Sequence, residues 1–116
     1  MKDSIESYDC LYIVLEFVDG KTTNYCKIGL CKEIGNIEKR LSMLQNGNPR
    51  RLIFARIYRV ENAFEVEQYL HGKYDTHRQV GEWFKIANHY FGNIDKIILN
   101  RNGKIIYADN NRKEVF

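Results

Sequence analysis

An alternation of apolar residues near the N-terminus constrains the fold of this chain more than any other feature. Every second residue of the segment 11–18 is apolar, which is the period of a strand with one buried face: Leu11, Ile13, Leu15 and Phe17. Asp19-Gly20 opens a polar loop that is expected to run to Asn24, and residues 25–30 then return as a second strand. The pattern predicts an antiparallel hairpin. One of its faces carries side chains with polar tips: Tyr12, Tyr25 and Lys27.

Beyond the hairpin, the apolar spacing changes to that of helices and back. Residues 33–45 have apolar positions at helical spacing, and the Asn46-Gly47-Asn48-Pro49 stretch ends that helix. The segment 52–60 is rich in β-favouring side chains and predicts a third strand. Asn62 is expected to cap a second helix, with Glu65 completing a capping box.

Shorter elements are expected in the C-terminal third of the chain. Residues 81–86 predict an extended piece, 87–99 a last helix, 104–107 a short strand and 109–114 a loose polar tail. The order β-β-α-β-α-(β)-α is that of one small α+β domain. We expect three parts: an N-terminal extension in residues 1–10, the domain in 11–99, and a C-terminal hairpin or tail in 100–116.

The composition excludes several classes of protein. With 44% hydrophobic residues, 28% charged residues and a single proline, the chain reads as a globular domain, neither disordered nor fibrous. No apolar run reaches the roughly 18 residues of a membrane span, and acidic residues interrupt the N-terminus where a signal peptide is apolar. Cys10, Cys26 and Cys31 are odd in number and lack zinc-type spacing. We therefore expect free thiols, a reducing intracellular location (cytoplasm, nucleoid or nucleus) without secretion, and no membrane partner.

Basic residues are concentrated in the middle of the chain. The whole chain has a net charge of +3, and eight basic against two acidic residues between Lys27 and Arg59 give that segment +6 and the remainder −3. A basic centre suits a polyanion such as a nucleic acid, and a solvated basic face is the equally weighted alternative. The candidates for nucleic-acid contact are Lys32, Lys39, Arg50, Arg51, Arg56 and Arg59.

Glu67 interrupts the apolar stripe of the second predicted helix, between Val66 and Leu70. A carboxylate in that position loses hydration, so it needs a cationic or metal partner. His71 follows one helical turn later, and the two side chains could face one cleft. A structural ion pair of Glu67 with a lysine or arginine is the preferred alternative, and a single histidine more often has a structural role.

Arg40 lies at the margin of the apolar stripe of the first predicted helix, beside Leu41. Its guanidinium suits bidentate contact with phosphate, because its fork of donors matches two oxygens. The alternative is an ordinary surface arginine, and Tyr12 taken alone is more often a packing residue. The sequence has no glycine-rich phosphate loop, no H-E-x-x-H motif and no serine nucleophile elbow.

A set of short motifs follows the first strand in a fixed order: Lys27-Ile28-Gly29, Arg40-Leu41, Asn48-Pro49, Glu67 to His71, and Gly81-Glu82-Trp83-Phe84. With the strand Leu11-Tyr12-Ile13-Val14 before them, they resemble the GIY-YIG nuclease superfamily. The sequence is similar in particular to the phage- and virus-encoded branch of that superfamily, over about residues 11 to 86.

This resemblance implies a three-stranded antiparallel sheet flanked by helices, and hydrolysis of phosphodiester bonds in DNA with one Mg²⁺ or Mn²⁺ ion. Tyr12 matches the tyrosine beside the attacking water, Arg40 the arginine that stabilises phosphate charge, and Glu67 the single metal-binding carboxylate. These residue types suit the chemistry. A hard oxygen ligand suits Mg²⁺, and an arginine stabilises charge that develops in the transition state.

Two positions depart from the superfamily pattern. Lys27 stands where the second motif begins with tyrosine, and Tyr25 is a candidate substitute two residues earlier on the same face. Lys27 could lower the pKa of Tyr12 or of water, or bind phosphate. The late asparagine of the pattern has Asn88 and Asn93 as candidates. The candidate catalytic residues are Tyr12, Lys27, Arg40 and Glu67, with Tyr25 and His71 as accessory residues.

Function hypotheses from three classes remain open from the sequence. The leading hypothesis is a metal-dependent DNA endonuclease. The alternative is a catalytically weak or inactive module on the same scaffold that binds nucleic acid or protein. A homodimeric regulator or inhibitor built on aromatic residues such as Trp83 and Phe91 is the third, although their spacing indicates core positions.

Overall fold

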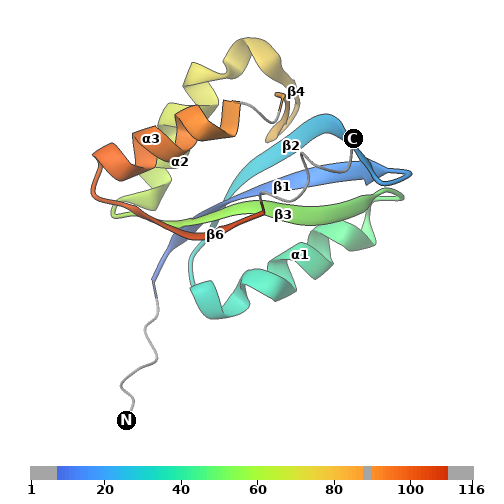
Figure 1. Ribbon diagram of the computed structural model, residues 1–116. Coiled ribbons are helices and arrows are strands. Elements are labelled where there is room, and N and C mark those ends of the chain that lie inside the picture. The colour runs from blue at the N-terminus through green and yellow to red at the C-terminus, as the bar shows by residue number, and fades with distance from the viewer. Residues whose placement is uncertain (1–7, 88–89, 110–116) are drawn as a thin grey trace.

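A six-stranded antiparallel sheet forms the centre of the protein, in the order β4-β5-β2-β1-β3-β6 (Figure 1). The computed structural model describes residues 8–87 and 90–109. Its strands are β1 (Cys10–Val18), β2 (Lys21–Cys31), β3 (Arg51–Arg59), β4 (Arg78–Val80), β5 (Trp83–Lys85) and β6 (Lys104–Ala108). Its helices are α1 (Ile37–Asn46), α2 (Ala63–Lys73) and α3 (Phe91–Asn100), with 3₁₀ turns at Ile34–Asn36 and Asp75–His77.

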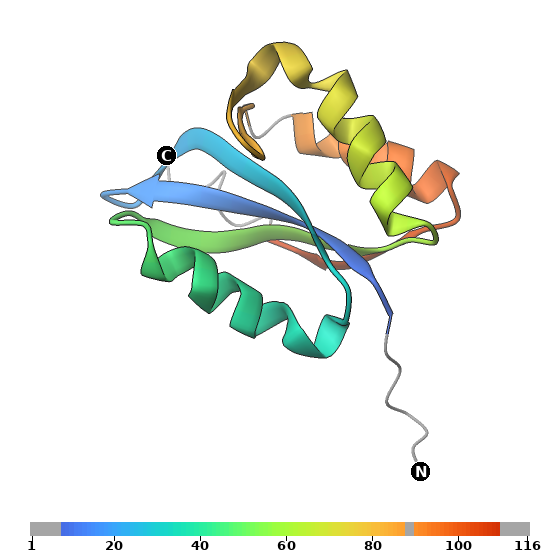
Figure 2. The same cartoon turned by 180° about the vertical axis from the view of Figure 1, so that it is seen from behind.

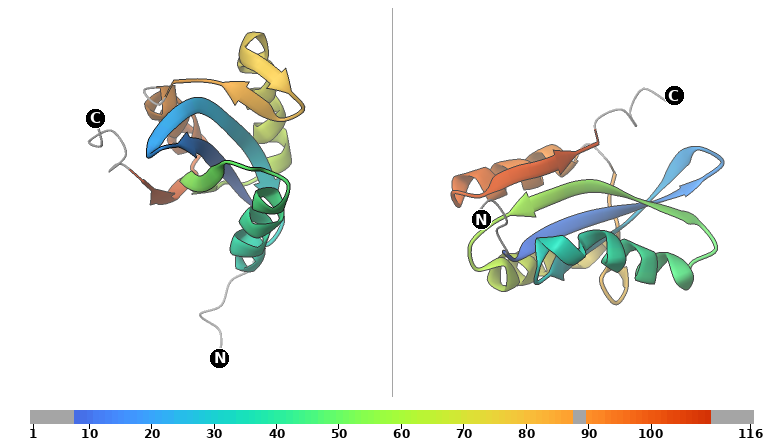
Figure 3. Two further views of the ribbon diagram at one scale, coloured as in Figure 1. Left: turned by 90° about the vertical axis from the view of Figure 1, so that its right-hand side faces the viewer. Right: turned by 90° about the horizontal axis from the view of Figure 1, so that it is seen from below.

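The helices cover both faces of the sheet. Figures 1 and 2 show α1 on one face and the pair α2 and α3 on the other, and the end-on view in Figure 3 shows the sheet between these layers. The predicted α+β class is confirmed, but the expected three strands are too few. The strands β4 and β5 have three residues each, which is too short for an alternating pattern to be recognised. None of the helices among residues 8–87 and 90–109 has the length and apolarity needed to cross a bilayer.

The predicted hairpin is present, with a shorter turn than expected. The strands β1 and β2 pair antiparallel, and only Asp19 and Gly20 separate them. Both turn residues have positive φ, 54° and 79°, as two-residue hairpin turns with the right twist require. The prediction that a polar loop extends to Asn24 is wrong, because residues 21–24 belong to β2.

The helix boundaries differ from the predicted ones at several points. The helix expected over 33–45 divides into a 3₁₀ turn and α1, and α3 begins at Phe91, later than expected. The predicted side-chain cap at Asn62 is wrong. Asn62 adopts a left-handed conformation (φ 56°) and makes no side-chain capping bond, and its backbone carbonyl accepts from Val66 instead. The predicted tail lies outside the described residues beyond Asp109.

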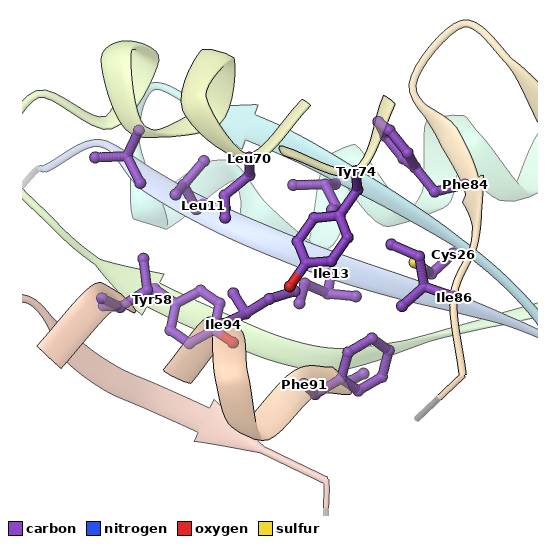
Figure 4. Close-up of a cluster of buried hydrophobic side chains, with 14 of the residues drawn as sticks. Leu11, Ile13, Cys26, Tyr58, Leu70, Tyr74, Phe84, Ile86, Phe91 and Ile94 are labelled. Atoms are coloured by element: carbon purple, nitrogen blue, oxygen red, sulfur yellow. The ribbon is translucent and has the colours of Figure 1, made fainter. Parts of the chain in front are cut away.

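The larger hydrophobic core lies between the sheet and the pair α2 and α3. Figure 4 shows Leu11 and Ile13 of β1 in this core with Leu70 of α2 and Ile94 of α3. These side chains are no more than 1% exposed. Burying each contributes roughly 1.5–3 kcal/mol, so the alternation in β1 is the main reason that α2 and α3 pack on this face.

A smaller core lies under α1, on the face that carries Tyr12. Cys10, Tyr12 and Val14 of β1 are buried there, and the half-buried Leu41 and Leu44 of α1 pack against them. Both faces of β1 are therefore covered, and Tyr12 lies inside the protein beneath a helix.

All three cysteines are free and buried. Burial raises the pKa of the Cys10 and Cys26 thiols to about 12. Because the thiolate is the reactive form, these cysteines are packing residues.

A buried ion pair joins α3 to the sheet. Arg56 of β3 is 8% exposed, and its Nε lies 3.0 Å from Oδ1 of Asp95 in α3. The Tyr58 hydroxyl donates to the same oxygen at 2.7 Å. Arg56, a sequence candidate for nucleic-acid contact, is therefore largely buried and engaged by Asp95.

Replacing Asp95 by alanine should lower the free energy of unfolding by roughly 3 kcal/mol, because Arg56 would stay buried without a counter-charge. The matched control is Arg50→Ala, which breaks the 2.9 Å pair with Glu16 where the Arg50 side chain is 48% exposed. That loss should be below about 1 kcal/mol. Urea unfolding of both variants measures the difference. Equal losses would contradict a special role for the Arg56–Asp95 pair.

Candidate active site at the edge of β2

The strand β2 has a neighbour on its outer side over only part of its length. β5 pairs with residues 25–27, and within the described chain the following residues of β2 pair only with β1. At this point the Nε2–H of His71 donates to the carbonyl of Ile28 at 2.8 Å. The Ile28 N–H donates to the carbonyl of Glu82 at 3.3 Å. Side chains of α2 and of the segment before β5 are therefore brought to one edge of the sheet.

Gly29 lets Tyr12 reach this edge from the neighbouring strand. Tyr12 and Gly29 are directly opposed in the β1–β2 register. A Cβ atom on Gly29 would collide with Cζ and the hydroxyl oxygen of Tyr12, so the phenol ring lies across the glycine. The glycine of the Lys27-Ile28-Gly29 motif is required by this close approach.

The Tyr12 hydroxyl lies in a buried and charged environment. Tyr12 is 1% exposed, and no group in residues 8–87 or 90–109 hydrogen-bonds its hydroxyl. Burial raises the pKa of Tyr12, the Arg40 guanidinium opposes the rise, and the carboxylates of Glu82 and Glu67 add to it. The pKa of Tyr12 is therefore raised overall, whereas the sequence analysis considered that Lys27 could lower it. The phenol is protonated at neutral pH and is a hydrogen-bond donor.

Glu67, His71 and Glu82 form a cluster beside Tyr12. One donor atom from each of the three lies within 4.8 Å of the others. Glu67 and His71 are 5% and 6% exposed. Burial raises the pKa of Glu67, and the neighbouring Glu82 adds to this rise, whereas His71 and Lys27 oppose it.

Glu67 has no cationic partner at ion-pair distance in the described part of the chain. Its one hydrogen bond there is a long one, 3.4 Å, from the amide of Gln68. The structural ion pair that periodicity favoured is therefore not found. A carboxylate left in this state is costly, and a cation bound beside it would offset the cost.

Lys27 is paired with Glu82, a residue to which the sequence analysis gave no role. The Lys27 Nζ lies 2.7 Å from Oε1 of Glu82, and the side chains are 14% and 42% exposed. Glu82 belongs to the Gly81-Glu82-Trp83-Phe84 motif, which was the available signal. Its role was missed because the position of β5 beside β2 could not be read from three residues of strand.

Arg40 opens onto a basic hollow next to Tyr12. The hollow has a volume of about 310 Å³ and is lined by Cys31, Lys32, Glu33, Asn36, Lys39, Arg40 and Met43. Arg40, Lys32 and Lys39 have no carboxylate at ion-pair distance among the described residues. Three basic side chains are thus available to an anion at one place.

The other basic candidates do not join this hollow. Arg50 is paired with Glu16 at 2.9 Å, and Arg51 lies exposed at the start of β3. The Arg59 guanidinium lies 4.3 Å from the centre of the Tyr8 ring, at the other end of the same strand. The basic residues of the middle segment are therefore spread over several surfaces.

The remaining candidates also lie apart from the Glu67 cluster. Tyr25 lines a separate hollow with Arg50 and Trp83. Asn93 is exposed on α3, and Asn88 lies outside the described residues. Phe91 is 3% exposed, which confirms the core position that its spacing indicates.

A family model described as the T5orf172 domain matches residues 9–100. The chain belongs to the T5orf172 domain family. The match includes every residue of the Glu67 cluster and of the basic hollow, as well as Tyr12. This T5orf172 domain is consistent with a nuclease-like or nucleic-acid-binding module of the kind found in phage proteins. No curated protein and no solved structure matches the chain.

Gly29→Ala should displace the Tyr12 ring and lower the free energy of unfolding by about 1–3 kcal/mol, because the added Cβ would collide with a ring that is 1% exposed and packed in the smaller core. Gly35→Ala is the control, since a Cβ there meets no atom within 4 Å. Urea unfolding of the two variants tests this. Equal stability of the two variants would mean that the Tyr12–Gly29 contact does not constrain the hairpin.

Proposed function

We propose that this T5orf172 domain is a metal-dependent endonuclease of the GIY-YIG type that hydrolyses phosphodiester bonds in DNA. Tyr12, Lys27, Arg40 and Glu67 are its catalytic residues. The observation that carries the proposal is the convergence at the edge of β2 of three polar groups that have no ion-pair partner and no short hydrogen bond among residues 8–87 and 90–109. They are the hydroxyl of the buried Tyr12, the guanidinium of Arg40 and the carboxylate of the buried Glu67.

The donor set suits a hard divalent cation. Glu67 supplies a desolvated carboxylate without a cationic partner among the described residues, and Mg²⁺ or Mn²⁺ accepts such an oxygen ligand. An ion held by Glu67 would supply positive charge for the phosphate and for the leaving oxygen.

Each catalytic residue then has a distinct task in the hydrolysis. A water oxygen forms a bond to phosphorus as one ester P–O bond breaks, and the proton lost by the water balances the one gained by the leaving oxygen. The Tyr12 hydroxyl and Lys27 orient the water and the phosphate. Arg40 binds non-bridging phosphate oxygens and stabilises the charge that grows on them.

Glu67→Gln should reduce Mg²⁺-dependent nicking of supercoiled plasmid by about a hundredfold or more, because the neutral amide holds a cation poorly. EDTA should abolish nicking by the unchanged protein. Glu65→Gln, an exposed carboxylate two residues away on α2, is the matched control and should nick normally. Full nicking by Glu67→Gln would contradict the assigned role of Glu67.

A nucleic-acid-binding module without catalysis is the second candidate, and the basic hollow favours it. Lys32 and Lys39 lie in that hollow with no carboxylate partner among the described residues. Contacts of such residues with phosphate release counterions, so binding weakens as salt rises. A folded protein that shifts DNA in a gel without nicking it would favour this candidate.

Lys32→Gln combined with Lys39→Gln should weaken DNA binding at all sequences and reduce the slope of log K against log salt by about 2. Lys96→Gln is the matched control, because Lys96 is exposed on α3, and α3 lies on the opposite face of the sheet from α1 (Figure 1). Fluorescence anisotropy over a salt series measures the slopes. An unchanged slope in the double variant would exclude the hollow as a phosphate contact.

A further inference from the structure

We propose that Glu82 and His71 complete a divalent-metal site with Glu67, and that the Lys27 ammonium is the counter-ion of Glu82 until a metal ion binds. This inference rests on the proposed function in taking Glu67 as a metal ligand. It adds two ligands and makes Lys27 a counter-ion that exchanges with the metal.

The spacing of the three donors suits a single ion. Ligand atoms bound at about 2.0–2.2 Å from a common ion lie within about 4.4 Å of one another. The donor atoms of Glu67, His71 and Glu82 lie within 4.8 Å of one another, so small side-chain rotations would bring all three to one ion. Glu67 is 5% exposed and has no ion-pair partner in the described residues, which makes this more than a surface group of acids.

His71 is held in the way that metal-binding histidines are held. A carbonyl oxygen can only accept, so Nε2 must be the donor in the 2.8 Å contact with Ile28. In the neutral ring this leaves the lone pair on Nδ1. Metal-binding histidines commonly donate their other N–H to a backbone carbonyl, which fixes the tautomer and the ring. A nitrogen ligand among carboxylates favours Mn²⁺ over Mg²⁺.

Lys27 competes with a metal ion for the same charge. Its Nζ lies 2.7 Å from Glu82, and its charge also acts on Glu67. A divalent ion bound to Glu67 and Glu82 would repel an ammonium at this distance, since like charges a few ångströms apart interact strongly at a partly buried site. Arrival of the metal therefore releases Lys27 from Glu82 and leaves it available to a substrate phosphate.

Titration of the full chain with Mn²⁺, followed by the electron paramagnetic resonance of the free ion, tests the proposal without using activity. Lys27→Gln should bind Mn²⁺ about tenfold more tightly, and Glu82→Gln and Glu67→Gln about tenfold or more weakly. Lys85→Gln and Glu65→Gln remove the same charges from exposed neighbouring positions and should leave the affinity unchanged. Thermal unfolding of each variant checks that it is folded.

The role of His71 is tested on the unmodified protein, because His71 packs against Phe84 and its replacement could disturb the fold. The spin-echo spectrum of bound Mn²⁺ should show coupling to one imidazole nitrogen. Absence of that coupling would overturn the assignment of His71. An unchanged or weaker Mn²⁺ affinity in Lys27→Gln, or an unchanged affinity in Glu82→Gln, would overturn the exchange between lysine and metal.

The two proposals fail in different ways. Plasmid nicking that needs Glu67, together with Mn²⁺ affinities that do not depend on Lys27 and Glu82, would refute this inference and leave the proposed function standing. Mn²⁺ affinities that change as expected, without any nicking, would support the site and refute the endonuclease.

Discussion

The close approach of Tyr12 to Gly29 is the contact on which the arrangement of the site depends. It joins the two strands of the hairpin in one register, and it carries a side chain of β1 across β2. A one-residue slip would move Tyr12 to the other face and place a larger residue beneath the ring. The same register sends Leu11 and Ile13 toward α2 and α3, so the core and the site are positioned by one pairing.

The half-buried Asp95 and the buried Glu67 are placed in opposite electrostatic environments. Asp95 is fully engaged, because Arg56 and Tyr58 both bind it and thereby hold α3 on the sheet. Glu67 of α2 is more deeply buried than Asp95 but has only a long hydrogen bond from Gln68 in the described residues. The first arrangement stabilises the fold, whereas the second leaves a local cost that a bound cation would remove.

The regular spacing of apolar residues along the chain predicted the longer strands and helices. The alternation in β1, the helical spacing of α1 and the position of Glu67 in the stripe of α2 could all be read from the chain. The extended segments predicted at residues 81–86 and 104–107 contain β5 and most of β6, but their positions in the sheet could not be read from the chain. The strand β4 was missed because three residues are too few to show a period. The roles of Glu82 and of Arg56 depend on such long-range contacts. For this reason the role of Glu82 was missed, and Arg56 was interpreted as a surface residue that contacts nucleic acid.

Lys27, which stands where the superfamily that the sequence resembles has a tyrosine, is paired with Glu82. A phenol at that position would offer Tyr12 a second hydroxyl, but it would leave Glu82 and Glu67 together without a positive charge. Lys27 supplies that charge at 2.7 Å from Glu82, so the pair keeps the cluster closer to neutral in the metal-free protein. On our proposal, the domain tolerates a more acidic metal site than a single carboxylate would make, because the Lys27 ammonium balances the charge of Glu82 until the metal binds.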